Sequence, residues 1–105
     1  MPRTIRCFYC DVRMTRWRPG LGGVMPPHAR TIDHVFAQKT HLHRQNALNT
    51  VECCNACNTH KGHLDPLDWL VIMPSNAGAR RLAALLYKLD VPLVEIDSCM
   101  ARRKR

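Results

Sequence analysis

Residues 54–62 read CNACNTHKG, and a second Cys-x-x-Cys pair stands far upstream at Cys7 and Cys10. Each pair has the spacing at which two thiolates bind one tetrahedral zinc ion, so the two pairs together offer four ligands. The basic N-terminus is followed by no long apolar run, so we expect a cytoplasmic, non-secreted protein with reduced thiols. A structural Zn²⁺ on Cys7, Cys10, Cys54 and Cys57 is favoured over two disulfides or a thioredoxin-like redox pair.

The length of the chain, 105 residues, predicts one small domain. A hydrophobic core of that size is marginal on its own, so a metal or disulfide staple is expected. The two remaining cysteines, Cys53 and Cys99, have no partner pair, and we interpret them as small buried hydrophobes.

Around the second cysteine pair the pattern predicts strand, loop, strand and helix. Residues 29–36 and 49–53 are predicted strands because they are rich in β-branched side chains. Residues 54–61 have the length of two helical turns, and Gly62 stands where a helix favours glycine at its C-terminal end. This arrangement places the second cysteine pair at the start of the helix.

The segment at residues 65–100 is predicted to be a helical extension, with a basic tail at residues 101–105. Asp65 followed by Pro66 is typical of a helix start, and Pro74 must end that helix. Ser75 is predicted to cap a second, longer helix. Its leucines fall at helical spacing and predict core packing, with a groove for a partner protein or a homodimer as the alternative: Leu82, Leu85, Leu86 and Leu89.

The charge of the chain is distributed unevenly. Residues 1–63 carry net +6, residues 64–100 net −2, and the last five residues add +4. Two basic regions favour a polyanionic partner, with nucleic acid as the leading candidate and a merely solubilising surface as the alternative. The longest apolar run is far shorter than the roughly 20 residues that a membrane-spanning helix needs, so no membrane partner is expected.

Asp33 and His34 are adjacent in the first predicted strand. A carboxylate and an imidazole can together hold a divalent cation and take a proton from water, as phosphodiester hydrolysis requires. Neighbours in an ideal strand point to opposite faces, so their convergence requires a strand end, a bulge or a bend.

The order of these elements resembles the HNH endonuclease family. The resemblance rests on the first cysteine pair, Asp33-His34, Asn49, and the run from Cys54 to Gly62, and covers residues 7 to 62. It implies an α+β fold with a small ββα-metal core, also called a His-Me finger, stapled by the four-cysteine zinc and extended by C-terminal helices. Small proteins of this family occur in bacteriophages and in bacterial restriction systems and mobile elements.

The resemblance also implies a role for each matching residue. His34 would be the general base that deprotonates the attacking water, and Asp33 would bind the catalytic metal. Asn49 would hold the loop between the strands through side-chain hydrogen bonds and so help to orient His34. Asn58 stands where the last histidine of the family name stands, so the chain is an H-N-N variant, with Asn58 as the second metal ligand.

The substitution of asparagine for histidine affects the choice of metal. Carboxylate and amide oxygens suit Mg²⁺ or Mn²⁺, so one of these is expected beside the structural zinc. His60 and His63 lie near enough to be substitute ligands or phosphate contacts, with exposed polar residues as the alternative. His41 and His43 are interpreted as loop residues.

Basic residues near the predicted site are candidates for gripping DNA, which we expect in double-stranded form in preference to RNA: Arg30, Lys39, Arg44 and Lys61. Arginines around the first cysteine pair could follow phosphates, and Trp17 could stack on a base or cover the core. The resulting hypothesis is a metal-dependent endonuclease that nicks or cleaves DNA. The alternative is a zinc-stapled module that binds nucleic acid without cutting it.

Overall fold

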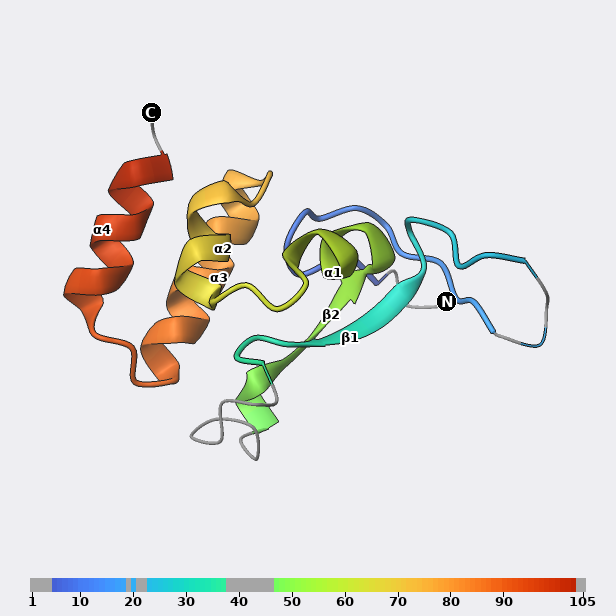
Figure 1. Ribbon diagram of the computed structural model, residues 1–105, viewed down its shortest axis with the longest axis horizontal. Coiled ribbons are helices and arrows are strands. Elements are labelled where there is room, and N and C mark those ends of the chain that lie inside the picture. Colours follow the sequence, from blue (N-terminus) through green and yellow to red (C-terminus); the bar gives the residue numbers. More distant parts are fainter. Residues whose placement is uncertain (1–4, 19, 21–22, 38–46, 104–105) are drawn as a thin grey trace.

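The computed structural model describes residues 5–18, 20, 23–37 and 47–103, and these form a two-stranded antiparallel sheet and four α-helices (Figure 1). The predicted α+β class is thereby confirmed. Strand β1, Arg30–His34, pairs with β2, Thr50–Cys54, so that His34 lies opposite Thr50. Helix α1, Asn55–Lys61, follows β2 directly and packs against the sheet. This unit carries Asp33, Asn49 and Asn58.

The ends of these elements have local causes. β1 stops before Val35, whose N–H donates to the carbonyl of Asn49, and a single 3₁₀ turn at Ala47–Asn49 leads into β2. Helix α1 begins one residue later than predicted because Cys54 is its N-cap, with the sulfur accepting from the N–H of Cys57 at 3.4 Å. Gly62 ends the helix as predicted, at a φ of 54° that favours glycine.

Three further helices form the C-terminal extension: α2 at Pro66–Ile72, α3 at Asn76–Lys88 and α4 at Leu93–Arg103. Asp65 and Ser75 are the N-caps of α2 and α3, as the sequence predicts. The last helix continues past residue 100, so residues 101–103 belong to it and not to a separate tail. Arg103 donates to the carbonyls of Leu70 and Met73 at 2.8 and 2.9 Å, which satisfies the C-terminal end of α2.

The leucine stripe of α3 packs in the core. Leu82 and Leu86 are fully buried and Leu89 nearly so, within one cluster that also contains Trp69 and Ile96 from the neighbouring helices. This confirms the core interpretation of the stripe. Several large apolar side chains remain exposed on these helices, and a partner or homodimer there stays a prediction: Ile72, Tyr87, Leu93 and Val94.

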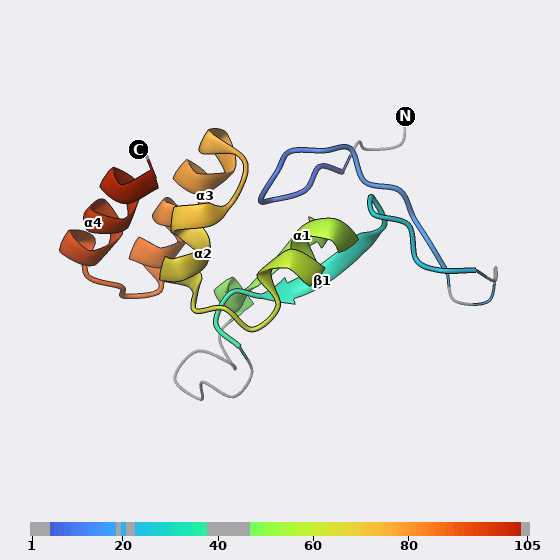
Figure 2. The same ribbon diagram turned by 45° about the horizontal axis from the view of Figure 1, so that its top comes forward.

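The loop that carries the first cysteine pair lies between the sheet unit and the helical extension and contacts both (Figure 2). On one side, Phe8 N–H donates to the carbonyl of Glu52 at 3.0 Å. On the other, Arg81 Nε in α3 donates to the carbonyl of Phe8 at 3.0 Å. Gly78 permits this contact, because a Cβ built there would lie 1.8 Å from the carbonyl oxygen of Tyr9. No helix in the described ranges is long and apolar enough to cross a membrane.

The variant Gly78→Ala is expected to lower the free energy of unfolding by about 2 kcal/mol. The new methyl group must push α3 away from backbone atoms of Tyr9, and this overpacking outweighs the roughly 1 kcal/mol that alanine contributes to a helix. Urea unfolding of the zinc-loaded protein measures the change. Gly20→Ala is the matched control, since a Cβ at Gly20 meets nothing within 4 Å. Equal stability of the two variants would contradict the prediction.

Candidate metal centre and adjoining pocket

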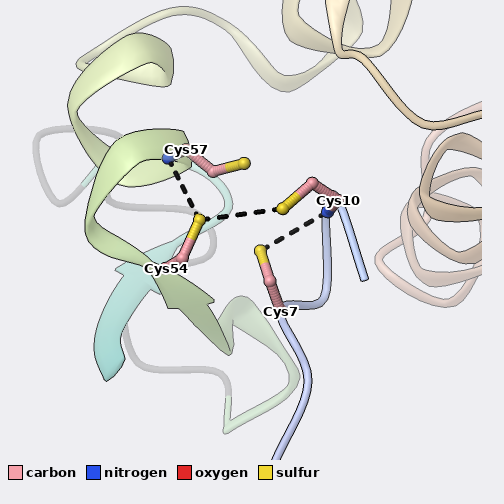
Figure 3. A group of neighbouring side chains, drawn as sticks. All are labelled: Cys7, Cys10, Cys54 and Cys57. Atoms are coloured by element: carbon pink, nitrogen blue, oxygen red, sulfur yellow. Dashed lines mark hydrogen bonds between the residues drawn. The ribbon is translucent and has the colours of Figure 1, made fainter. Parts of the chain in front are cut away.

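The two cysteine pairs meet at the junction of β2 and α1. The four sulfur atoms of Cys7, Cys10, Cys54 and Cys57 all lie within 4.8 Å of one another and point toward a common centre (Figure 3). The sulfurs of Cys10 and Cys54 are 3.7 Å apart. A tetrahedral zinc with bonds of about 2.3 Å requires sulfur separations of about 3.8 Å. Because a disulfide requires about 2.05 Å, the geometry fits a four-thiolate metal site and not cross-linked pairs.

Backbone N–H groups surround this cluster. Tyr9 and Cys10 donate to the sulfur of Cys7 at 3.3 and 3.4 Å, and Cys57 donates to that of Cys54. Such donors stabilise thiolates, the form in which cysteine binds a metal. The donor set and its spacing therefore suit a cation such as zinc.

Protons are shared unequally among these thiols. A hydrogen bond from Cys57 is the largest cause that lowers the pKa of Cys7, to about 4, and the pKa of Cys57 is raised by the same contact. Burial raises the pKa of Cys10 to about 11. Four thiolates at this spacing repel one another, so a divalent cation is the natural means of holding all four in the charged form.

Cys53 and Cys99 lie outside the cluster, as predicted. Cys53 is fully buried beside Thr31, and burial raises its pKa to about 12. Cys99 is also buried, in α4, where its sulfur accepts from Arg102 at 3.1 Å. Both are therefore buried side chains of the interior that lie apart from the four-sulfur cluster.

A separate pocket of about 360 Å³ lies where β1 ends against the end of α1. Asp33, His34 and Asn58 all line it, so the structure brings together these three predicted site residues. Asp33 and His34 are the last two residues of β1. The pocket is completed by Ile32, Ala37, Gly62 and His63.

The carboxylate of Asp33 is buried and held by two donors. The hydroxyl of Tyr9 donates to Oδ2 at 2.6 Å, and Nζ of Lys61 lies 3.1 Å from the same oxygen. Burial and the neighbouring Asp33 together raise the pKa of Tyr9, which keeps its hydroxyl protonated as a donor. Both donors from the described part of the chain bind Oδ2 of Asp33.

Asn58 extends from α1 back toward β1. Its amide nitrogen donates to Oγ1 of Thr31 at 3.0 Å and to the carbonyl of Ile32 at 3.4 Å. These bonds orient the amide and reserve Oδ1 for another partner. Asp33 and Asn58 thus line one pocket, although they come from different elements.

Asn49 is fully buried and replaces a backbone pair at the open end of the sheet. Its Oδ1 accepts from the N–H of Phe36 at 2.7 Å, and its Nδ2 donates to the carbonyl of Phe36 at 3.1 Å. These are the side-chain hydrogen bonds expected to hold the loop between the strands. The further expectation, that they help to orient His34, stays a prediction.

The structure separates the two histidines near the end of α1. His63 lines the pocket, whereas the ring of His60 packs edge to face on Trp69 with centroids 5.4 Å apart. His60 therefore stabilises the contact between α1 and α2, and His63 is the one placed to act at the pocket. His41 and His43 lie outside the described residues.

The burial of Lys61 contradicts the prediction that this residue contacts nucleic acid at the surface. Its side chain is 1% exposed, and its ammonium bonds Asp33 and the carbonyl of His34, the latter at 3.0 Å. Arg30 is exposed but pairs with Glu52 at 2.7 Å, so its contact with DNA stays a prediction. Lys39 and Arg44 lie outside the described residues. Trp17 is half-buried, between the two roles considered for it.

Tyr9 and Lys61 are the two partners of Asp33 that sequence reasoning missed. In both cases the surrounding sequence suggests another role. Tyr9 stands between two cysteines with zinc-ligand spacing, and Lys61 stands at the end of a predicted helix in a basic region. For Tyr9 one signal exists in the sequence: a tyrosine within a metal-binding loop is expected to be buried, and a buried tyrosine hydroxyl needs a hydrogen-bond partner.

Comparisons of the chain with protein-family models, with curated proteins and with solved structures found no match.

Proposed function

We propose that the chain is a metal-dependent endonuclease of the HNH type, with a ββα-metal core, that hydrolyses DNA phosphodiester bonds. The single observation that supports this most is the convergence of Asp33, His34 and Asn58 on one pocket from β1 and α1. A carboxylate, an imidazole and an amide oxygen are the groups that a one-metal hydrolytic site requires.

Two metals have distinct places in this proposal. Zn²⁺ on the four cysteines is structural, because four protein ligands leave no open position for substrate. The catalytic ion, Mg²⁺ or Mn²⁺, would be held by Asp33 and Asn58, whose hard oxygens suit it. When bound, it supplies positive charge to the phosphate and to the leaving oxygen in the transition state.

The proton of the attacking water goes to the imidazole of His34. Histidine suits this role because its ordinary pKa lies close to neutral pH, where the neutral ring can accept a proton. The carbonyl of His34 is held by buried Lys61, which anchors the backbone from which the ring extends. One base at one pocket cuts one strand, so each site produces a nick.

Exposed arginines supply the charge for holding a DNA backbone. On the loop segment of the first cysteine pair the side chains of four arginines are exposed: Arg6, Arg13, Arg16 and Arg18. In this proposal they follow phosphates and produce a binding affinity that falls steeply with salt.

One observation favours a second candidate, a zinc-stapled module that binds DNA without cutting it. Lys61 already neutralises Asp33 with an ammonium group at 3.1 Å, so the carboxylate is compensated even with no divalent ion. In that case the pocket would hold no catalytic metal.

Supercoiled plasmid incubated with Mg²⁺ or Mn²⁺ separates the two candidates. The proposal expects wild-type protein to convert the plasmid to open circles, EDTA to stop the reaction, and His34→Ala to slow it by about 10²-fold or more. His28→Ala is the matched control, because His28 is exposed and does not line the pocket, and should cut like the wild type. Wild-type protein that retards DNA in a gel but leaves it supercoiled with either metal would overturn the endonuclease in favour of the binding module.

A further inference from the structure

We infer that Tyr9 is a positioning residue that ties the carboxylate of Asp33 to the four-cysteine cluster, so that the cluster sets the geometry of the catalytic metal site. This inference rests on the proposed function for the role of Asp33. It assigns to the first cysteine pair a task beyond holding the fold together.

The backbone of Tyr9 is set by the cluster. Tyr9 lies between Cys7 and Cys10, and its own N–H donates to the sulfur of Cys7 at 3.3 Å. On the opposite side α3 leaves it no room, because Gly78 approaches the carbonyl of Tyr9 closely enough that a Cβ would collide with it. A metal ion that fixes the four sulfurs thereby fixes the position of this residue.

The side chain of Tyr9 transmits that position to the pocket. It is fully buried, and its ring packs edge to face against Trp69 with centroids 5.4 Å apart and planes at 85°. A ring confined in this way has little freedom to rotate away. Its hydroxyl oxygen is therefore held 2.6 Å from Oδ2 of Asp33, to which it donates its proton.

Lys61 completes the clamp from the other side of the chain. Its ammonium lies 3.1 Å from the same Oδ2 and comes from the end of α1. The side chains of Lys61 and Asp33 are nearly inaccessible to water, with exposures of 1% and 7%. Two donors from different elements on one oxygen stop the carboxylate from turning about its χ2 angle. The other oxygen, Oδ1, is then held in one direction relative to Asn58.

Groups that orient a metal ligand are worth a measurable part of the metal affinity. Loss of such a partner typically weakens metal binding or activity by 10–100-fold. Loss of the Tyr9 hydroxyl removes no charge. In this arrangement the hydroxyl contacts no substrate, so its effect is confined to the direction of the Asp33 carboxylate.

The test is the variant Tyr9→Phe, which deletes the hydroxyl and keeps the ring. Mn²⁺ is titrated into the zinc-loaded protein without DNA, and binding is followed by the paramagnetic resonance signal of free Mn²⁺. The dissociation constant for Mn²⁺ is expected to rise about tenfold, while zinc remains at one ion per chain. Tyr87→Phe is the matched control, because Tyr87 is 61% exposed, and it should bind Mn²⁺ like the wild type.

The outcomes distinguish this inference from the proposed function. Unchanged Mn²⁺ binding in Tyr9→Phe overturns it, even if thermal stability falls, since a purely structural tyrosine would give that result. Wild-type binding that Asp33→Asn does not weaken overturns it as well. If Mn²⁺ binding changes as expected but the wild-type protein cuts no DNA, the endonuclease fails while the positioning role of Tyr9 stands.

Discussion

Cys54→Ala is expected to abolish the cooperative folding of the chain at 25 °C. The variant loses one of four metal ligands and also the N-cap of α1. Zinc bound by such a site contributes on the order of 10 kcal/mol at neutral pH, which is as much as the whole stability of a typical domain, about 5–15 kcal/mol. Thermal unfolding followed by circular dichroism, together with the zinc content of the purified protein, measures the result.

The neighbouring residue provides the control for this experiment. Cys53→Ala removes a buried sulfur from the same strand but leaves all four ligands in place. It should keep one zinc per chain and unfold cooperatively, with a loss of about 1 kcal/mol for the sulfur removed from the core. A zinc-free Cys54→Ala protein that melts within a few degrees of the wild type would show that the cluster is not a structural staple.

Lys61→Met is expected to lower the free energy of unfolding by about 3 kcal/mol or more. The substitution keeps the buried stem but leaves the carboxylate of Asp33 charged and without its cation in the interior, a change that typically costs about 3–5 kcal/mol. Lys88→Met, at the exposed end of α3, should cost less than about 1 kcal/mol. Urea denaturation of zinc-loaded protein compares the two.

A double variant tests the cause of that loss. Asp33→Asn in the Lys61→Met background removes the uncompensated charge, so the double variant should be more stable than the sum of the two single changes predicts. Additive losses would mean that the pair contributes nothing through its charge and that Lys61 acts only by packing.

Local signals in the sequence were sufficient for much of the fold. Asp65, Ser75 and Gly62 mark helix ends through bonds or backbone angles that involve only near neighbours, so their roles can be read from a short window. The two cysteine pairs carry their own spacing rule in the same way. The ends of the strands are harder to predict. Beyond Val35 the backbone pairing of the two strands gives way to hydrogen bonds from the side chain of Asn49 to the backbone of Phe36, and strand propensity does not describe such bonds.

The site depends on contacts between distant residues, and there prediction was weaker. A lysine at the end of a helix is usually solvated, and only the packing of α1 on β1 turns Lys61 inward to Asp33. His60 and His63 lie three residues apart, yet one packs on Trp69 and the other lines the pocket, because Gly62 ends the helix between them. The sequence predicts a basic tail at Arg103, whereas its side chain bonds carbonyls at the end of α2 that lie 33 and 30 residues earlier, a contact that no local signal predicts.

The position of the first cysteine pair also matters while the chain is being synthesised. Cys7 and Cys10 emerge from the ribosome long before Cys54, since 43 residues separate the two pairs. Until Cys54 and Cys57 have emerged, only two of the four metal ligands, Cys7 and Cys10, are available. Helix α3, which covers their loop, has not yet been synthesised. During this interval the two thiols are open to oxidation or to a foreign metal, and the four-cysteine site can form only after the later pair is free of the ribosome.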